Sequence, residues 1–278
     1  MKNFIIRTVT GALFVAALIG GILYGKLSFG ILFFAITILS VNEFCSLIRQ
    51  YKKVTFSNLL AICGGAYLFV AFFMASHLKD VNILQIFAPY MAVLLYAFIR
   101  QLFDTKSKPL DNFAYFVLSQ VYAALPFALL NLLSTGGAYN GDTYSFVLPL
   151  SIFIFIWSND TGAFCFGCML GRHKMFERIS PKKTWEGFAG GAIVAMGAGA
   201  VMSIFFDVMT MWEWMAMAAV VVGSATLGDL IESSMKREMQ IKDSGKMLPG
   251  HGGILDRFDS TLLAVPAVLV YLSFIGIL

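Results

Sequence analysis

The sequence predicts an all-α fold, a polytopic bundle of about nine transmembrane helices with the N-terminus in the cytoplasm. Of the 278 residues, 59% are hydrophobic and only 13% are charged, against about 25% charged residues in an ordinary soluble domain. The mean hydropathy is +0.79. Apolar runs of about 18 residues or more recur along the chain, and each is long enough as a helix to cross a hydrocarbon layer of about 30 Å. The strict alternation of barrel strands is absent, which favours helices.

The nine predicted spans follow one another with short loops in the first half of the chain. Lys2 and Arg7 ahead of the first apolar stretch could indicate a secretory signal, but no small-residue cleavage site follows them. We therefore interpret this stretch as an uncleaved first helix. The predicted span centres are Ala16, Ala35, Phe69, Leu94, Ala124, Phe153, Ala195, Ala218 and Val268.

Basic residues set the predicted orientation, because cytoplasmic loops carry an excess of Lys and Arg. With the N-terminus in the cytoplasm, only Lys26 and Lys79 of the 20 basic residues lie outside. The C-terminus then lies outside as well. The two longest polar connections, roughly residues 165–186 and 233–257, face the cytoplasm, where nucleotides are found.

Three features within or beside the spans have structural interpretations. Glu43 lies near the cytoplasmic end of the second span, and we interpret it as a side chain that reaches the interface. Cys165-x-x-Cys168 lacks a second pair or a nearby histidine for zinc, so we assign it to helix packing. The Gly187-x-x-x-Gly191 spacing predicts the close approach of a neighbouring helix.

The first polar cluster follows the sixth span. Asp160 closes that span, where a carboxylate is costly unless it meets a cation or a metal. Ser180 and Pro181 predict the N-cap and first residue of a helix, with lysines in the first turn. Cations oppose the helix dipole there, and a bound anion would explain them, whereas the positive-inside rule explains only their number. The candidate binding residues are Asp160, Ser180, Lys182, Lys183 and Thr184.

The second cluster gathers acids and bases around the start of the last span. Helical spacing puts Asp229, Ser233 and Lys236 on one face. Asp256 and Asp259 are three residues apart on a predicted helix, and three converging carboxylates with oxygen-only ligands favour Mg²⁺. Pairing of acids and bases on a solvated face is the alternative. The turn at Gly252 and Gly253 permits close backbone approach, and the candidate phosphate-binding residues are Lys236, Arg237, Lys242, Lys246 and Arg257.

These motifs together resemble the signature of the phosphatidate cytidylyltransferase, or CDP-diacylglycerol synthase, family. The resemblance rests on Ser233-x-x-Lys236-Arg237, Lys242-Asp243, Pro249-x-His251-Gly252-Gly253 and Asp256-Arg257-x-Asp259, and on the earlier blocks Asp160-Thr161-Gly162-Ala163 and Ser180-Pro181-Lys182-Lys183-Thr184-x-Glu186-Gly187. Two positions depart from the pattern. Phe164 stands where the family often has tyrosine, and Cys168 where it often has a basic residue.

The resemblance implies a magnesium-dependent transfer of the cytidylyl group of CTP to phosphatidate, giving CDP-diacylglycerol and pyrophosphate. Asp229, Asp256 and Asp259 would hold Mg²⁺, and Lys236, Arg237 and Arg257 would act with Asp256 and Asp259 in catalysis. Ser180, Lys182 and Lys183 would contact a lipid phosphate or the triphosphate. Ser233, Lys242, Lys246, His251, Gly252 and Gly253 would bind substrate, with His251 a hydrogen-bonding or structural residue rather than a base.

One integral membrane domain is expected, with scaffold helices over about residues 1–145 and catalytic helices and cytoplasmic loops over about 146–278. Two alternative functions remain: a CTP-dependent kinase of a membrane lipid alcohol, and an ion-coupled transporter, which the absence of an inverted repeat disfavours. A basic pI near 8.8 restates the positive-inside bias, so no nucleic-acid partner is expected. A homodimer in the plasma or inner membrane is compatible with the sequence.

Overall fold

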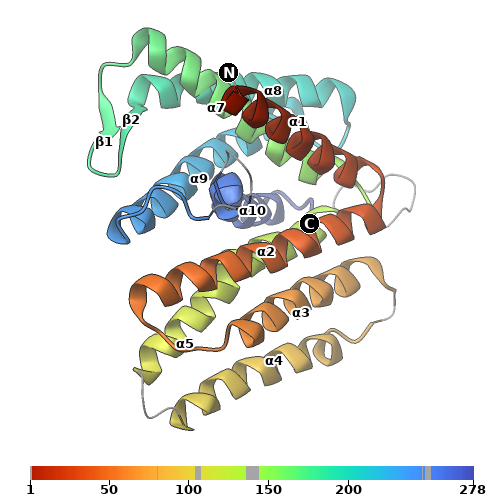
Figure 1. Ribbon diagram of the computed structural model, residues 1–278. Helices are drawn as coiled ribbons and strands as arrows, with labels where there is room; N and C mark the ends of the chain where they lie inside the picture. Colours follow the sequence, from red (N-terminus) through yellow and green to blue (C-terminus); the bar gives the residue numbers. More distant parts are fainter. Residues whose placement is uncertain (1, 80, 104–107, 136–143, 246, 248–251) are drawn as a thin grey trace. The chain divides into compact units, whose positions relative to one another are not determined.

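The computed structural model describes residues 2–79, 81–103, 108–135, 144–245, 247 and 252–278. Most of this part of the chain is helical, which confirms the predicted fold class, and two short strands are added (Figure 1). The elements are α1 (Lys2–Leu23), α2 (Lys26–Lys52), α3 (Asn58–His77), α4 (Ile83–Arg100), η1 (Gln101–Phe103), α5 (Pro109–Leu118), η2 (Ser119–Ala124), α6 (Leu125–Leu133), α7 (Val147–Leu170), β1 (Lys174–Phe176), β2 (Ser180–Thr184), α8 (Trp185–Phe205), α9 (Met211–Glu238) and α10 (Leu255–Phe274).

The apolar helices are those of a multi-pass membrane protein. Among the described residues, eight helical segments are long and apolar enough to cross a membrane, judged by length and composition. α5, η2 and α6 form one of them as a continuous run over Pro109–Leu133. Every predicted span centre lies in a helix. The first helix differs from the others because its described apolar stretch, Thr8–Leu23, is shorter.

The chain forms two compact units. The first comprises Met1–Tyr144 together with Asp243–Arg257, and the second comprises Ser145–Lys242 together with Phe258–Leu278. The predicted division near residue 145 into scaffold helices and catalytic helices stays a prediction. No sequence pattern predicts that the segment Asp243–Arg257 groups with the N-terminal helices. A single integral domain over the whole chain stays a prediction.

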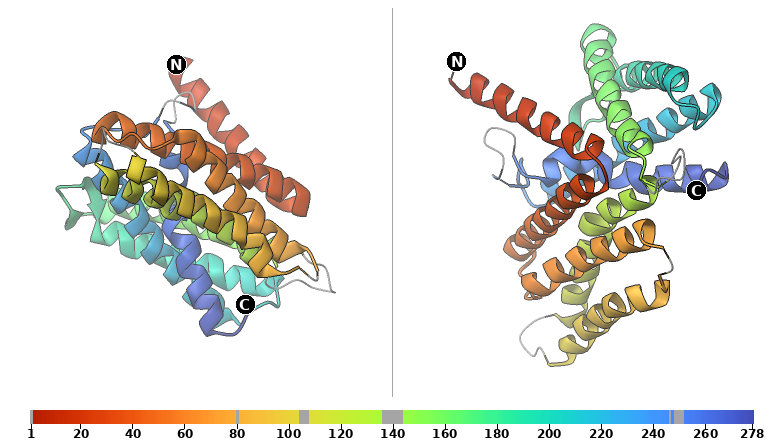
Figure 2. Two further views of the ribbon diagram at one scale, coloured as in Figure 1. Left: turned by 90° about the horizontal axis from the view of Figure 1, so that it is seen from below. Right: turned by 90° about the vertical axis from the view of Figure 1, so that its right-hand side faces the viewer.

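The first unit is built around neighbouring helices. α3 packs against α2 and against α4, and the three lie side by side (Figures 1 and 2). α3 begins where Ser57 accepts a hydrogen bond from the backbone N–H of Leu60 at 3.3 Å, as an N-cap does. The side chains of Phe29, Phe33 and Phe44 are buried in this unit. The N-terminal helices therefore have a packed interior of their own.

The second unit contains closely packed glycine-bearing helices. α8 packs against both α7 and α9. A Cβ atom added at Gly187 would lie 3.0 Å from the carbonyl oxygen of Ala163 on α7, and one at Gly191 would overlap Asn159. The predicted close approach at Gly187-x-x-x-Gly191 is confirmed. Two other residues on α7, Cys165 and Cys168, are exposed, so their assignment to helix packing is wrong.

The segment between α7 and α8 is a β-hairpin rather than the start of a helix. β1 and β2 pair antiparallel, with Lys174 opposite Thr184 and Phe176 opposite Ser180. The prediction that Ser180 is the N-cap of the following helix is wrong. Thr184 is extended and caps α8 by accepting the N–H of Gly187 at 3.2 Å. Pro181 is compatible with β2, because a two-stranded sheet leaves each strand an edge without a partner.

Candidate active site

A cavity of about 190 Å³ opens in the second unit. Its walls come from α7, the hairpin, α8, α9 and α10, so elements far apart in the sequence contribute to it. The predicted residues that line it belong to both polar clusters: Asp160, Lys182, Lys183, Thr184 and Asp229. The structure therefore joins the two clusters at one cavity.

A salt bridge connects the hairpin to α9 at this cavity. The Nζ atom of Lys183 lies 2.6 Å from Oδ2 of Asp229, and both side chains are about 70% buried. Partial burial makes such a pair stronger than one in bulk water. Asp160 also interacts electrostatically with both of these residues. Because α7 continues to Leu170, Asp160 lies inside the helix, which corrects the prediction that it closes the span.

Asp259 on α10 extends this charged group. Its carboxylate interacts electrostatically with Asp229 and with Lys236. Asp160, Asp229 and Asp259 therefore bring three carboxylates into one neighbourhood, together with Lys183 and Lys236. The lysines that line the cavity, Lys182 and Lys183, can receive an anion.

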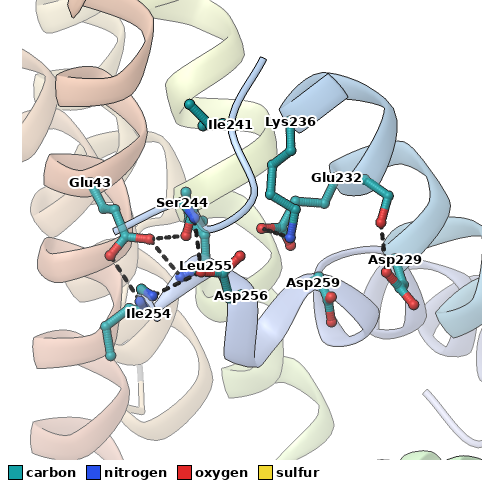
Figure 3. A network of polar contacts seen from close by, with 12 residues as sticks. Glu43, Asp229, Glu232, Lys236, Ile241, Ser244, Ile254, Leu255, Asp256 and Asp259 are labelled. Carbon is teal, nitrogen blue, oxygen red and sulfur yellow. Dashed lines mark hydrogen bonds and ion pairs between the residues drawn. The ribbon is translucent and has the colours of Figure 1, made fainter. Parts of the chain in front are cut away.

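The C-terminal turns of α9 hold Asp229 in place (Figure 3). The hydroxyl of Ser233 donates a hydrogen bond to Oδ1 of Asp229 at 3.1 Å, which confirms that these two residues share a helix face. Glu232, the residue before Ser233, is 3% exposed, and its Oε1 lies 3.3 Å from Nζ of Lys236. Sequence reasoning did not single out Glu232. The buried pair restricts the ammonium group of Lys236 to one side of α9.

Glu186 on α8 fastens the hairpin that carries the two lysines. Its carboxylate accepts the backbone N–H of Arg172 at 3.1 Å and that of His173 at 3.2 Å, and its Oε1 lies 2.5 Å from Nδ1 of the His173 ring. The N–H of Trp185 donates to the carbonyl oxygen of His173 at 3.0 Å. The first residues after α7 are therefore bound to the first turn of α8, which closes the hairpin at its base.

Three further polar residues line the cavity that sequence reasoning left out of the candidate set. Asn159 is 6% exposed, and its side-chain oxygen has no hydrogen-bond partner among the described residues. Thr226 lies one helical turn before Asp229, and Ser260 follows Asp259. Helical spacing from the aspartates is the signal that could have identified Thr226.

The predicted glycine turn and Asp256 lie in the first unit. Oδ2 of Asp256 accepts the backbone N–H of Ser244 and that of Gly253, both at 2.8 Å. Gly252 has φ +84°, a conformation that side chains disfavour, and a Cβ added there would lie 2.5 Å from Oδ2 of Asp256. These contacts show that the turn approaches Asp256 closely, whereas a role of the turn in binding phosphate stays a prediction. They also assign Asp256 a structural role that the sequence does not predict.

The remaining candidates are not gathered at the cavity. Arg237, Lys242 and Arg257 are exposed, and Ser180 begins β2 without lining the cavity. Lys246 and His251 lie outside the described residues. In the part of the chain that the structure describes, no three Asp, Glu, His or Cys side chains form a group that could hold a metal ion. The magnesium site at Asp229, Asp256 and Asp259 therefore stays a prediction.

Comparisons with known proteins cover almost the whole chain. A family model described as the cytidylyltransferase family matches residues 5–275. The chain is 29% identical over 268 residues to a phosphatidate cytidylyltransferase of Staphylococcus saprophyticus, across 96% of this chain and 98% of that protein. It is 30% identical over 275 residues to the phosphatidate cytidylyltransferase of Bacillus subtilis, across 96% and 97%. Identity to the Staphylococcus epidermidis phosphatidate cytidylyltransferase is 45% over 124 residues, across 44% and 48%.

Proposed function

The chain belongs to the cytidylyltransferase family, and from that premise we propose that it transfers the cytidylyl group of CTP to phosphatidate, giving CDP-diacylglycerol and pyrophosphate. Similarity over nearly the full length of two phosphatidate cytidylyltransferases supports this substrate pair. The structural observation that carries the proposal is the cavity lined by Lys182, Lys183, Asp160 and Asp229. Both substrates are phosphates, and this cavity offers cations for them.

The reaction needs no nucleophilic side chain. A phosphate oxygen of phosphatidate attacks the α-phosphorus of CTP, a new P–O bond forms, and the bond between the α-phosphorus and the bridging oxygen breaks. Pyrophosphate leaves with that electron pair. Because the reactants are both anionic, catalysis rests on positioning and on neutralising charge. Lys182 and Lys183 supply positive charge at the cavity, and the buried contact with Glu232 orients Lys236.

Magnesium is part of the proposal. The carboxylates of Asp229 and Asp259 interact with each other, and oxygen donors of this kind suit Mg²⁺. Asp256, three residues ahead of Asp259 on α10, is the third proposed ligand. Bound Mg²⁺ would neutralise phosphate charge and polarise the transferred group. Lys236, Arg237 and Arg257 remain the proposed catalytic cations, and Ser233 and Lys242 the proposed substrate contacts.

Nine membrane crossings with a cytoplasmic N-terminus are the proposed topology. The distribution of basic residues supports it, since only Lys26 and Lys79 would lie outside. α8 and α9 are two consecutive spans, so the hairpin before α8 and the connection after α9 return to the same side of the membrane. This topology puts both polar clusters in the cytoplasm. CTP would then reach the cavity from water, while the acyl chains of phosphatidate stay in the bilayer. A homodimer remains compatible with the sequence.

The decisive experiment follows the cytosine ring. Purified protein in detergent is given phosphatidate, Mg²⁺ and CTP labelled in the ring, and the lipid fraction is counted. We expect ring label in lipid only when phosphatidate and Mg²⁺ are both present. Transfer of γ-phosphate without the ring would instead indicate a lipid kinase. Ion flux in liposomes without any lipid product would indicate a transporter.

A further inference from the structure

Glu43 on α2 makes contacts that its position in the sequence does not suggest. The side chain is 8% exposed, so the interpretation that it reaches the interface is wrong. A buried carboxylate is costly unless several donors satisfy it. The donors here come from one short segment, Asp243–Arg257, which lies about two hundred residues later in the chain and belongs to the same compact unit.

The carboxylate of Glu43 caps the start of α10 (Figure 3). Its Oε2 accepts the backbone N–H of Ile254 at 2.8 Å, and its Oε1 accepts that of Leu255 at 3.1 Å. Leu255 is the first residue of α10. The first N–H groups of a helix have no partner within the helix and carry partial positive charge, so a carboxylate is their natural acceptor. In this protein a different helix supplies that acceptor.

Ser244 links Glu43 to Asp256. The hydroxyl of Ser244 donates to Oε1 of Glu43, and the backbone N–H of the same residue donates to Oδ2 of Asp256. That oxygen of Asp256 also accepts the N–H of Gly253. Two carboxylates, one on α2 and one on α10, therefore hold the two ends of the segment together.

The glycines of the segment are fitted to the Glu43 side chain. A Cβ added at Gly245 would lie 2.7 Å from Oε2 of Glu43, and one at Gly253 would overlap Oε1. The contact thus requires both a carboxylate on α2 and the absence of side chains opposite it. A glutamate that only reached the interface with water would need neither the carboxylate contacts nor glycines opposite it.

We propose that Glu43 is a positioning residue for cytidylyl transfer: through Ser244 and the first N–H groups of α10, it fixes the helix start that carries Asp256 and Arg257. This inference rests on the proposed function, because it concerns residues assigned to that reaction. In the proposed reaction Glu43 contacts neither substrate. It acts by keeping the first turns of α10 and the preceding glycine turn in one conformation.

Glu43→Gln tests the proposal, with Thr37→Val as the matched control. Glutamine has nearly the same shape, but its amide nitrogen cannot accept the N–H groups that the second carboxylate oxygen accepts. Thr37 is a buried polar residue on the same helix whose hydroxyl donates to the carbonyl of Phe33 at 2.7 Å, so its substitution perturbs a second buried polar position of α2. Both variants are measured for kcat, for KM of CTP and of phosphatidate, and for melting temperature in detergent.

We expect kcat of Glu43→Gln to fall roughly ten- to a hundred-fold, the cost of displacing catalytic groups by a fraction of a bond length or more. KM should change much less than kcat, and the melting temperature should stay within a few degrees of the wild type. Thr37→Val should retain wild-type kcat. Ser244→Ala should reduce kcat, and combining it with Glu43→Gln should cost little more than Glu43→Gln alone, because both act through one contact.

Hydrogen–deuterium exchange supplies a readout that does not depend on activity. Peptides covering residues 252–258 should exchange faster in Glu43→Gln and unchanged in Thr37→Val. Unchanged exchange together with wild-type kcat in Glu43→Gln would overturn the proposal, as would an equal loss of kcat in both variants. If the wild type itself shows no cytidylyl transfer, the proposed function fails instead, and accelerated exchange would still support the structural contact.

Discussion

Lys183 on β2 and Asp229 on α9 form a salt bridge of 2.6 Å across the cavity of the second unit. The pair joins a lysine of the hairpin to an aspartate of the second polar cluster. Because each side chain is about 70% buried, the ammonium group of Lys183 and the carboxylate of Asp229 are restrained by the surrounding protein. The contact couples the position of a lysine proposed to bind phosphate to that of a proposed metal ligand.

Lys183→Met should therefore lower kcat/KM by at least about 100-fold, since one cation that would stabilise the transferring phosphate is lost and Asp229 loses its partner. Lys174→Met is the matched control. Lys174 is exposed on β1 of the same hairpin and does not line the cavity, so its loss should change kcat/KM less than about two-fold. Steady-state assays of ring-labelled CTP incorporation decide between the variants, and equal effects would refute a specific role for Lys183.

A comparison of Asp256→Asn with Asp256→Ala should separate the role of the carboxylate charge in turnover from its role as a hydrogen-bond acceptor for the loop. The asparagine oxygen can still accept the N–H groups of Ser244 and Gly253 that Oδ2 of Asp256 accepts. We expect Asp256→Asn to stay folded and lose turnover, because the proposed metal would lose a charged ligand. Asp256→Ala leaves two amide donors without an acceptor and should also lose about 1–3 kcal/mol of stability. Melting curves alongside activity assays test this, and substantial turnover in well-folded Asp256→Asn would contradict the metal assignment.

Removal of divalent cations provides an independent check on the same carboxylates. Dialysis of purified protein against a chelator should lower cytidylyl transfer by at least about 100-fold, and added Mg²⁺ should restore it. Calcium at equal concentration should restore less, because Mg²⁺ demands a tighter octahedral arrangement of oxygens. Full activity after exhaustive chelation would count against any role for Asp229 and Asp259 in binding a metal.

The glycines of α8 predict unequal effects along one helix. Gly191→Ala would push a methyl group into Asn159, which lines the cavity, and should cost about 1–3 kcal/mol of stability. Gly197→Ala should be neutral or stabilising by up to about 1 kcal/mol, because nothing lies within 4 Å of the added Cβ. Thermal denaturation in detergent measures both. A tolerated Gly191→Ala would mean that α7 and α8 can separate at no cost.

The positions of the helices could be predicted from sequence because hydropathy is a local sum, and every predicted centre lies in a helix. The number of nine spans stays a prediction, since eight described segments are long and apolar enough to cross a membrane. The helical spacing of Asp229 and Ser233 was equally local, and a hydrogen bond of 3.1 Å confirms it. A turn at Gly252 and Gly253 was predicted from these residues in the sequence, and the positive φ of Gly252 explains why glycine is required there.

The errors arose where a distant partner decides the local structure. Ser180 followed by Pro181 is a good helix start by local rules, but Glu186 binds the backbone at Arg172 and His173, which leaves the segment between them as a hairpin. Glu43 illustrates the same point over a longer range. Its donors lie 201 to 212 positions away, and no local pattern around the second span identifies them.

The hydrogen bonds from Arg172 and His173 to Glu186 hold the base of the hairpin closed, and their loss should affect substrate binding. Glu186→Ala would free the N–H groups of Arg172 and His173 and open the base of the hairpin that holds Lys182 and Lys183. We expect a roughly ten-fold increase in KM for whichever substrate these lysines bind, with a smaller change in kcat, because binding is weakened while the carboxylates keep their positions.

Glu177→Ala, at an exposed turn of the same hairpin, is the matched control and should leave both constants unchanged. Separate titrations of CTP and phosphatidate would then reveal which substrate the hairpin binds, since only its KM should rise. If Glu186→Ala and Glu177→Ala behave alike, substrate binding by the hairpin lysines does not depend on the hydrogen bonds of Glu186.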